Sequence, residues 1–262
     1  MPGNAAVNAA GNAGNATGGP ATTGLPLGPV LSLCEPVPDL PEGVLGWTTT
    51  RAAGSFGLSS NEPVAEVMAR WDALQADFQA LGIERLASAH QVHGAEVASH
   101  GGGWRGWLRL RGVDGHVTTT PGTALAVTVA DCTPVVVVHP GGAVAVLHAG
   151  WRGTAAGILR VGLAELAQRG FAAADCRVHL GPSICGRCYE VGPEVLEAVT
   201  GRPAAGKGCL DVRATLLEQA RALGVRAITV DEGCTRCHQA RYFSHRGGDA
   251  GRLLGLVALR SA

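Results

Sequence analysis

The chain contains one cysteine and two histidines that could together bind a transition metal. His93 precedes the glycine of HQVHG, Cys132 lies in the turn of ADCTP, and His148 ends the apolar run AVAVLH before AGWRG. A thiolate and two imidazoles suit zinc or copper, and three protein ligands leave one position open for water or a substrate. The three residues are candidate ligands of a catalytic metal ion, and spacing alone leaves a purely structural role open for them.

A second histidine near His93 competes for the same role. In the strand expected over residues 88–97, His90 and His93 would lie on opposite faces, because successive side chains of a strand alternate. We select His93, because Gly94 beside it permits the bend or close backbone approach that a ligand at a strand end needs. Asp131, next to the cysteine, could orient a ligand imidazole or hold a water molecule.

The same residues allow a different chemistry, in which Cys132 is a nucleophile. His148 or His93 would be the general base, and the backbone N–H groups of residues 150–153 would stabilise an oxyanion. This mechanism requires a thiol pKa below its ordinary value. Stoichiometric metal in the purified protein would distinguish the metal site from such a hydrolase.

Two CxxC motifs, Cys185-Gly-Arg-Cys188 and Cys234-Thr-Arg-Cys237, form a second group of cysteines. Paired CxxC motifs are typical of structural zinc sites. The segment 189–233 between them is much longer than the about 15 to 20 residues usual in a zinc ribbon. A second metal site and independent buried thiols therefore both remain open.

The composition argues against partners that are recognised by charge. Of the 262 residues, 46% are hydrophobic and 16% charged, and the 21 basic and 21 acidic side chains cancel. Without a broad electrostatic field we expect no binding to nucleic acid or to an anionic membrane. The longest apolar run, over residues 133–147, is interrupted and falls short of the roughly 20 residues of a membrane span.

The N-terminal segment differs in composition from the rest of the chain. Residues 1–28 contain no Lys or Arg and consist largely of Asn, Ala, Gly and Thr. They predict a disordered low-complexity tail and not a secretory signal. Residues 29–262 are then expected to form a single catalytic domain, in a cytoplasmic protein whose eight cysteines are mostly reduced.

Hydrophobic periodicity predicts the elements that position these residues. A first helix should begin after Asn61 as N-cap and end at Gly82, with Trp71 in its apolar stripe and Asp77 on another face. Residues 101–112 should form a loop or an exposed hairpin. The other expected helices cover residues 154–168, 192–200 and 212–223. The other expected strands cover residues 44–50, 114–120, the apolar runs on either side of Asp131, 177–180, 226–230 and 253–259.

Strands and helices alternate, but several consecutive strands lack a helical crossover. Nearly continuous apolar strands are typical of strands buried on both faces. The sequence therefore predicts a three-layer α/β fold of the α+β type, with a mixed β-sheet covered by helices on both faces. The glycines after His148 should begin a helix whose N–H groups and dipole favour an anion beside Arg152.

Five segments, in this order, resemble one known bacterial family. They are QVHGAEV, DGHVTTTPGTALAVTVADCTPVVVV, AVLHAGWRGTAAGI, LGPSICGRCYEVGPEV and YFSHR with a later GR. From Val44 to Leu259 the chain resembles proteins first described as multicopper polyphenol oxidoreductases of the laccase-domain type and later as zinc-dependent purine nucleoside phosphorylases. ADC and HAGWRGT are specific to that family.

The resemblance implies a Zn2+ or Cu2+ ion held by His93, Cys132 and His148. It implies phosphorolysis of adenosine, inosine and S-methyl-5'-thioadenosine, together with adenosine deamination. Arg152 would take part in catalysis beside the metal ligands, as a cation for phosphate. Four further residues are implied as substrate contacts: Arg51, Arg70, His245 and Arg246.

The chain departs from the family pattern close to these contacts. The loop after Arg51 is shortened to AAGSFGLSS, Ala69 replaces an Asn, and Gly247 stands where a second Arg often follows FSHR. Cys188 and Cys234 match family positions, whereas Cys185 and Cys237 are local additions.

Other functions remain as alternatives to the phosphorylase. A copper-dependent phenol oxidase would need clusters of histidines, and no His-x-His pair occurs in the sequence. A cysteine hydrolase and a cell-wall-related binding protein are the other candidates. We expect a monomer or weak homodimer that binds small molecules.

Overall fold

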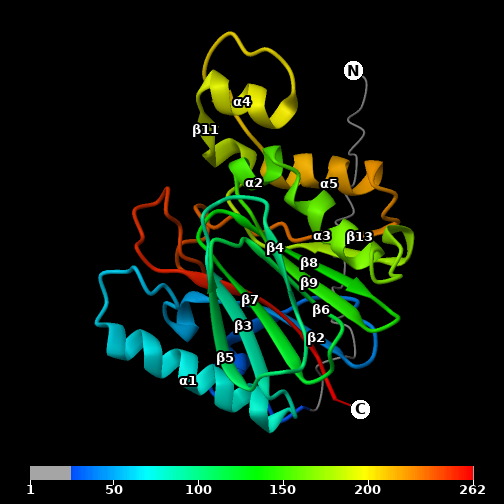
Figure 1. The fold of residues 1–262 in the computed structure, drawn as a ribbon. Helices are drawn as coiled ribbons and strands as arrows, with labels where there is room; N and C mark the ends of the chain where they lie inside the picture. The colour runs from blue at the N-terminus through cyan, green and yellow to red at the C-terminus, as the bar shows by residue number, and fades with distance from the viewer. Residues whose placement is uncertain (1–24, 262) are drawn as a thin grey trace, which may run out of the picture.

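Most strands of the computed structural model, which describes residues 25–261, lie in two six-stranded sheets (Figure 1). The first sheet contains, in spatial order, β1 (Cys34–Pro36), β2 (Val44–Thr49), β14 (Leu253–Leu259), β7 (Thr123–Val129), β3 (Arg85–His90) and β5 (Gly106–Arg111). The second contains β13 (Ala227–Val230), β10 (Arg177–Leu180), β8 (Thr133–His139), β9 (Ala143–Ala149), β6 (Gly115–Thr118) and β4 (Val97–His100). Both sheets mix parallel and antiparallel pairs, and β11 (Glu190–Val191) pairs separately with β12 (Gly208–Cys209).

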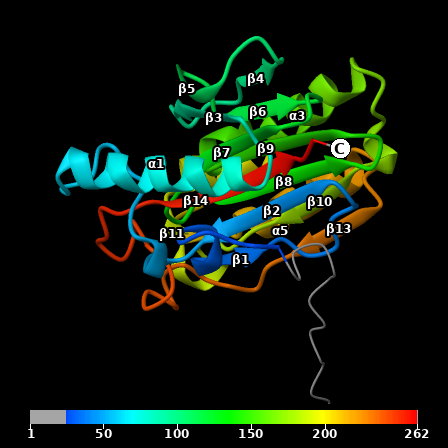
Figure 2. The same cartoon turned by 90° about the horizontal axis from the view of Figure 1, so that it is seen from below.

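Helices cover the outer face of each sheet. The α-helices in the described chain are α1 (Val64–Ala80), α2 (Trp151–Ala155), α3 (Ile158–Ala167), α4 (Pro193–Thr200) and α5 (Val212–Ala222). The short 3-10 helices are η1 (Leu31–Leu33), η2 (Arg51–Ala53), η3 (Ala173–Asp175) and η4 (Gly186–Cys188). Helix α1 lies on the first sheet, whereas α3 and α5 lie on the second (Figure 2).

The mixed α/β class is confirmed, but two sheets replace the single sheet that we expected. Strand β7 explains the difference, because its side chains alternate between two cores. Ala124 and Ala126 pack in the core under α1, whereas Leu125 and Val127 pack in a core between the two sheets. The strands are buried on both faces as predicted, but one face of each central strand meets the opposite sheet.

Helix α1 buries the stripe that the sequence predicts, including Val67, Trp71 and Phe78. Its N-cap is Pro63 and not Asn61. Asp77 was expected on another face and is instead only 4% exposed. Its carboxylate accepts hydrogen bonds of 2.8 Å from the N–H groups of Val30 and Leu31, which compensates for its burial.

Three expected elements near the candidate site are different in the structure. The strand expected over residues 88–97 is interrupted by a loop between β3 and β4. The helix expected over 154–168 is divided into α2 and α3 by Gly157, whose φ of 78° is left-handed. Residues 106–111 form strand β5, parallel to β3, and Trp107 stacks on Trp71 at 4.4 Å between ring centroids.

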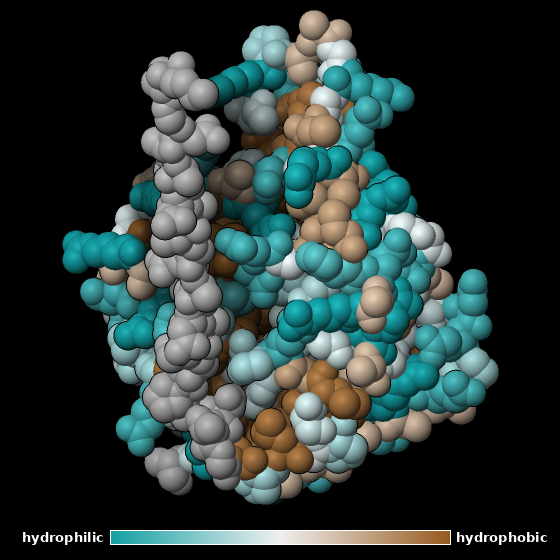
Figure 3. All heavy atoms as spheres, turned by 180° about the vertical axis from the view of Figure 1, so that it is seen from behind, coloured by the Kyte–Doolittle hydropathy of each residue, from teal (hydrophilic) through white to brown (hydrophobic). Residues whose placement is uncertain are grey.

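The N-terminal tail was predicted over residues 1–28, and residues 1–24 lie outside the described part of the chain. Leu25 and Leu27, which the prediction placed in the tail, pack against the core under α1. The surface seen in Figure 3 is mostly hydrophilic, with hydrophobic residues in scattered patches. No helix within residues 25–261 is long and apolar enough to cross a membrane.

Candidate metal centre

The structure brings together the three ligands that the sequence proposes. One ligand atom each of His93, Cys132 and His148 lies within 4.8 Å of the other two. The two imidazole rings meet edge to face, with 4.7 Å between centroids. His148 is the second-last residue of β9, Cys132 lies in the turn between β7 and β8, and His93 lies in the loop after β3. The choice of His93 over His90 agrees with this grouping.

Asp114, which the sequence analysis missed, organises two of the three ligands. Its buried carboxylate lies 2.8 Å from Nδ1 of His148. The same carboxylate accepts hydrogen bonds of 2.8 to 3.1 Å from the N–H groups of Val92, His93 and Gly94. It thereby holds the His93 loop, including the left-handed φ of 62° at His93.

The hydrogen bond to Asp114 also fixes the tautomer of His148. Burial by itself raises the pKa of Asp114, but hydrogen bonds from His148 and the loop N–H groups lower it below its ordinary value. An ionised carboxylate only accepts, so Nδ1 of His148 donates and Nε2 is the atom available to a metal ion. This carboxylate–histidine arrangement is typical of metal sites.

Two glycines leave room for the site. A Cβ at Gly150 would lie 2.9 Å from Sγ of Cys132 and 3.3 Å from the His93 ring. A Cβ at Gly153 would lie 2.7 Å from the carbonyl oxygen of Gly94. The segment HAGWRG therefore requires these glycines so that α2 can lie directly against the His93 loop and the thiol.

The site also changes the acidity of its members. Burial by itself raises the pKa of Cys132, but charge on His148 and hydrogen bonds with both histidines lower it from 9.0 to about 6. Burial lowers the pKa of His148, but Cys132 and Asp114 raise it from 6.5 to about 9. The thiolate is the form that binds metal, and a metal ion would displace the proton from His148.

Asp131 has a different role from the one that we expected. Its carboxylate accepts a hydrogen bond of 2.6 Å from the Thr235 hydroxyl and one of 2.7 Å from the N–H of Arg246. These bonds connect the Cys132 turn to the segment 235–246. Asp131 therefore positions a loop and does not orient a ligand imidazole.

The three ligands line a cleft of about 550 Å³. Aromatic and cationic side chains are distributed over its walls. The aromatic ones are Phe56, Trp71, Trp151 and Tyr189, and the arginines are Arg109, Arg152, Arg246 and Arg252. His90 and His245 also line it. A cleft of this size is typical for a small-molecule ligand.

Three residues that were expected near the substrate line this cleft. Arg152 is exposed and lies 4.5 Å over the Trp151 ring, and no hydrogen bond or ion pair of its guanidinium occurs within residues 25–261. Arg246 lies 4.9 Å over the Tyr189 ring and donates to the carbonyl of Glu190 at 2.9 Å. His245 is exposed beside Arg246.

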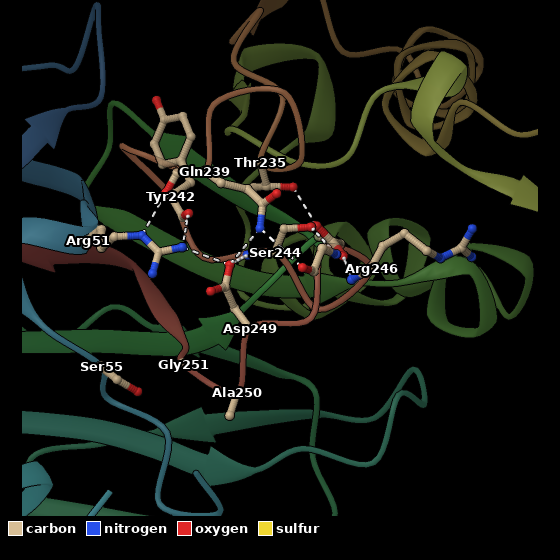
Figure 4. Close-up of polar contacts among 12 residues, drawn as sticks. Arg51, Ser55, Thr235, Gln239, Tyr242, Ser244, Arg246, Asp249, Ala250 and Gly251 are labelled. Carbon is tan, nitrogen blue, oxygen red and sulfur yellow. Dashed lines mark hydrogen bonds and ion pairs between the residues drawn. The ribbon is translucent and has the colours of Figure 1, made fainter. Parts of the chain in front are cut away.

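Arg51, which was expected to contact substrate, does not line the cleft. Figure 4 shows its guanidinium directed into the loop that follows β13. It donates to the carbonyls of Gln239 at 2.6 Å and Tyr242 at 3.0 Å, and pairs with Asp249 at 2.7 Å. Arg51 therefore holds the segment that carries Arg246.

Arg70, which was also expected to contact substrate, is likewise outside the cleft lining. It donates to the carbonyl of Ser55 at 2.7 Å and pairs with Glu62 at 2.6 Å. Its side chain fills the space beside Gly54, where a Cβ would lie 2.5 Å from Nε. Arg70 therefore holds the shortened loop, whose residues 56–60 form part of the cleft wall.

Sequence reasoning missed Asp114, Arg109, Arg252 and Tyr189. Asp114 begins the DGH segment, but nothing in its spacing connects it with His93 or His148. Arg109 and Arg252 come from β5 and from the residue before β14, whose positions beside the cleft follow only from the pairing of the strands.

Fold and site together define a mixed α/β protein with a His/Cys/His metal-binding group on the wall of a large cleft. The chain belongs to the multi-copper polyphenol oxidoreductase laccase family, whose family model matches residues 48–260. This confirms the family that the sequence motifs indicated.

Named relatives and a solved structure are similar to most of the chain. Adenosine deaminase RL5, from an unknown prokaryotic organism, is 40% identical over 159 residues, which cover 55% of this chain and only 61% of that protein. Purine nucleoside phosphorylase SCO2081 of Streptomyces coelicolor is 38% identical over 192 residues, which cover 69% of this chain and 78% of that protein. The crystal structure of YlmD from Geobacillus stearothermophilus matches with a TM-score of 0.77 and 31% identity, over 84% of this chain and 93% of that one.

Proposed function

We propose that the protein is a zinc-dependent purine nucleoside phosphorylase that also deaminates adenosine. Its substrates would be adenosine, inosine and S-methyl-5'-thioadenosine, with phosphate as the second substrate. The observation that carries the proposal is the convergence of His93, Cys132 and His148 on the wall of a cleft with aromatic and cationic sides. Relatives at 38% and 40% identity are named for phosphorolysis and for deamination.

The donor set fits zinc better than copper in this proposal. Zinc accepts two imidazoles and one thiolate with an open fourth position, and Asp114 fixes the imidazole of His148 in the ligating tautomer. When bound, the ion supplies a Lewis acid and a site that increases the acidity of a bound water molecule. Multicopper oxidation would need further histidine clusters, and the described residues contain one metal-binding group with histidine.

The chain's own residues would bind and orient the two substrates. Arg152 and Arg246 present positive charge at the cleft, where phosphate must approach the ribose. Tyr189 and Trp151, both partly exposed, offer aromatic surface for the purine ring. Arg51 and Arg70 would act indirectly, since they hold the two cleft segments that carry Arg246 and Phe56.

We propose a monomer or weak homodimer with one catalytic domain over residues 29–262. We propose a cytoplasmic location, because a thiolate ligand persists where cysteines stay reduced. No disulfide occurs among the described cysteines.

An assay of adenosine with and without phosphate tests the function. We expect adenine to be released only when phosphate is present, and inosine to form in either case. Cys132→Ala should reduce both activities by at least about 100-fold, because catalysis through the metal ion needs the complete ligand set. Product identity by liquid chromatography is the measurement.

Cys209→Ala is the matched control, since Cys209 is exposed and belongs to neither cysteine-containing metal group. It should leave both activities unchanged. Retention of adenine release by Cys132→Ala would remove the metal group from the mechanism.

A cysteine hydrolase is the second candidate, because the pKa of Cys132 is lowered to about 6 between two histidines. It would form a covalent thioester or related adduct on Cys132 and would work without metal. If the protein still converts adenosine after a chelator has removed all metal, the result would favour the hydrolase over the phosphorylase.

A further inference from the structure

Four cysteines outside the cleft meet at one point of the structure. One sulfur atom each from Cys185, Cys188, Cys234 and Cys237 lies within 4.8 Å of the other three. The two CxxC motifs come from different parts of the chain, with Cys185 and Cys188 around η4 and the other pair in the loop after β13. The long segment 189–233 contains α4, α5 and β13, and β13 lies beside β10 in the second sheet, so its length does not prevent the two motifs from meeting.

The spacing of the sulfur atoms matches ligands of one ion and not a disulfide. Around zinc, Zn–S bonds of about 2.3 Å in a tetrahedron place the sulfurs about 3.8 Å apart. Sγ of Cys188 and Sγ of Cys237 are separated by 3.4 Å, far beyond the about 2.05 Å of an S–S bond. All four sulfurs lie within 4.8 Å of one another, so small shifts would bring them to the separation of about 3.8 Å that one tetrahedral zinc ion requires.

Backbone N–H groups already support one of these sulfurs as a thiolate. Sγ of Cys234 accepts hydrogen bonds from the N–H of Cys185 at 3.3 Å and from the N–H of Cys237 at 3.4 Å. Such bonds to ligating sulfur stabilise its negative charge and orient it. Each CxxC motif also carries one arginine, Arg187 or Arg236, so both motifs contribute a positive charge to this part of the chain.

Backbone hydrogen bonds hold the two cysteine loops side by side. Ser183 and Cys234 form an isolated parallel β-bridge, with hydrogen bonds from Ser183 N–H to the carbonyl of Gly233 and from Thr235 N–H to that of Ser183. This bridge connects the two loops at the base of the cysteine cluster. The arrangement of the sulfurs is therefore a consequence of the fold and not of four flexible side chains.

We propose that Cys185, Cys188, Cys234 and Cys237 form a second, structural metal site that binds one zinc ion through four thiolates. A tetrahedral set of four sulfurs is characteristic of structural zinc, with no open position for a substrate. The ion would cross-link the loop that ends at Tyr189 to the segment that continues through Thr235 to Arg246. Thr235 in turn bonds to Asp131, so the structural ion would hold one wall of the cleft.

Elemental analysis of protein purified under reducing conditions tests the site directly. We expect two zinc ions per chain in the wild-type protein and one in Cys132→Ala. Cys185→Ser with Cys237→Ser should also leave one ion, bound at the cleft. Cys209→Ser, at an exposed cysteine outside the cluster, should retain both ions. Counting the two sites separately distinguishes a failure of this proposal from a failure of the proposed function.

A second measurement avoids variants of the cluster that fail to fold. Folded Cys132→Ala protein is titrated with a mercurial thiol reagent while a chromogenic chelator reports released zinc. Release of one zinc as the four cluster thiols react supports the structural site. A Cys132→Ala protein that contains no zinc while these thiols are reduced, or a Cys188–Cys237 disulfide found by peptide mass spectrometry, would overturn it.

Discussion

Asp114 is the single residue on which most of the candidate metal centre depends. One carboxylate holds the ring of His148 and three successive N–H groups of the His93 loop. It is fully buried, so its negative charge is acceptable only because four donors surround it. The geometry of two ligands is therefore coupled through a residue that touches no substrate.

Asp114→Asn tests this coupling at the residue scale. The amide keeps the shape of the carboxylate but loses its charge and presents an NH2 group to donors. Zinc affinity at the cleft should fall by roughly 10- to 100-fold, as for other partners of ligating histidines. Competition with a chelator of known affinity measures the change. Asp72→Asn, at an exposed position on α1, should leave the affinity unchanged.

The lowered pKa of Cys132 predicts how its reactivity depends on pH. Without metal, alkylation of Cys132 should rise with an apparent pKa near 6, below the ordinary value of 9.0. A lowered pKa also means that the thiolate's contribution to stability is complete above about pH 9 and is lost as the pH falls through about 6.

Peptide mass spectrometry of metal-depleted protein treated with iodoacetamide from pH 5 to 9 checks this prediction. Cys34 is the internal control, because burial and nearby carboxylates raise its pKa to about 12. Cys34 should stay unmodified over that range. A midpoint near 9 for Cys132 would contradict the ion pair with His148.

Loops, and not helices or strands, form most of the cleft wall, so the elements that hold these loops matter. Arg51 at the start of η2 fixes the segment after β13, and Arg70 on α1 fixes the loop at residues 55–62. Both arginines lie on regular elements that pack in the core under α1. The cleft therefore receives its shape from the first sheet and its helix, although the metal ligands come from both sheets.

Arg51→Ala should loosen the segment that carries His245 and Arg246. Loss of its bonds to Gln239, Tyr242 and Asp249 should reduce the free energy of unfolding by about 2 kcal/mol, in the range for hydrogen bonds to charged groups. KM for phosphate should rise more than kcat falls. Urea unfolding and steady-state kinetics are the measurements.

Arg105→Ala is the matched control for this prediction. Arg105 pairs with Glu84 at 3.1 Å, but the two side chains are 78% and 47% exposed. Such surface pairs contribute roughly 0 to 1 kcal/mol. An unfolding energy and KM for Arg51→Ala no different from those of this control would show that Arg51 has no positioning role.

At the scale of the whole molecule, the close contact between the two sheets determines where the ligands meet. Gly255 on β14 faces Pro134 on β8, and a Cβ at Gly255 would lie 2.5 Å from Cβ of Pro134. Pro134 is two residues after Cys132. A side chain at position 255 would therefore separate the sheets next to the candidate metal centre.

Gly255→Ala should destabilise the protein by about 1 to 3 kcal/mol through overpacking. Differential scanning calorimetry should show a melting temperature lower by several degrees. Gly101→Ala is the control, because no atom lies within 4 Å of a Cβ built there. Equal melting temperatures for both variants would contradict the tight contact between the sheets.

The local pattern of the sequence was sufficient for most elements and for naming the candidate ligands. Strand β14 covers the predicted residues 253–259, and α4 begins at Pro193 as expected. His93, Cys132 and His148 were proposed as candidate ligands from their residue types and their positions at the ends of expected strands, and the family resemblance supported that choice. Periodicity of side chains and the chemistry of single residues are encoded within a few positions of the chain, so they can be read without the fold.

Contacts between distant segments were decided only by the tertiary structure. Asp114 meets His148 across 34 positions, and Arg51 meets Asp249 across 198. The meeting of the four sulfurs of the second cluster and the division into two sheets also depend on contacts between distant segments. An apolar strand buried on both faces has the same sequence whether a helix or a second sheet covers it. Which element covers it depends on packing between remote parts of the chain, and local periodicity does not specify that packing.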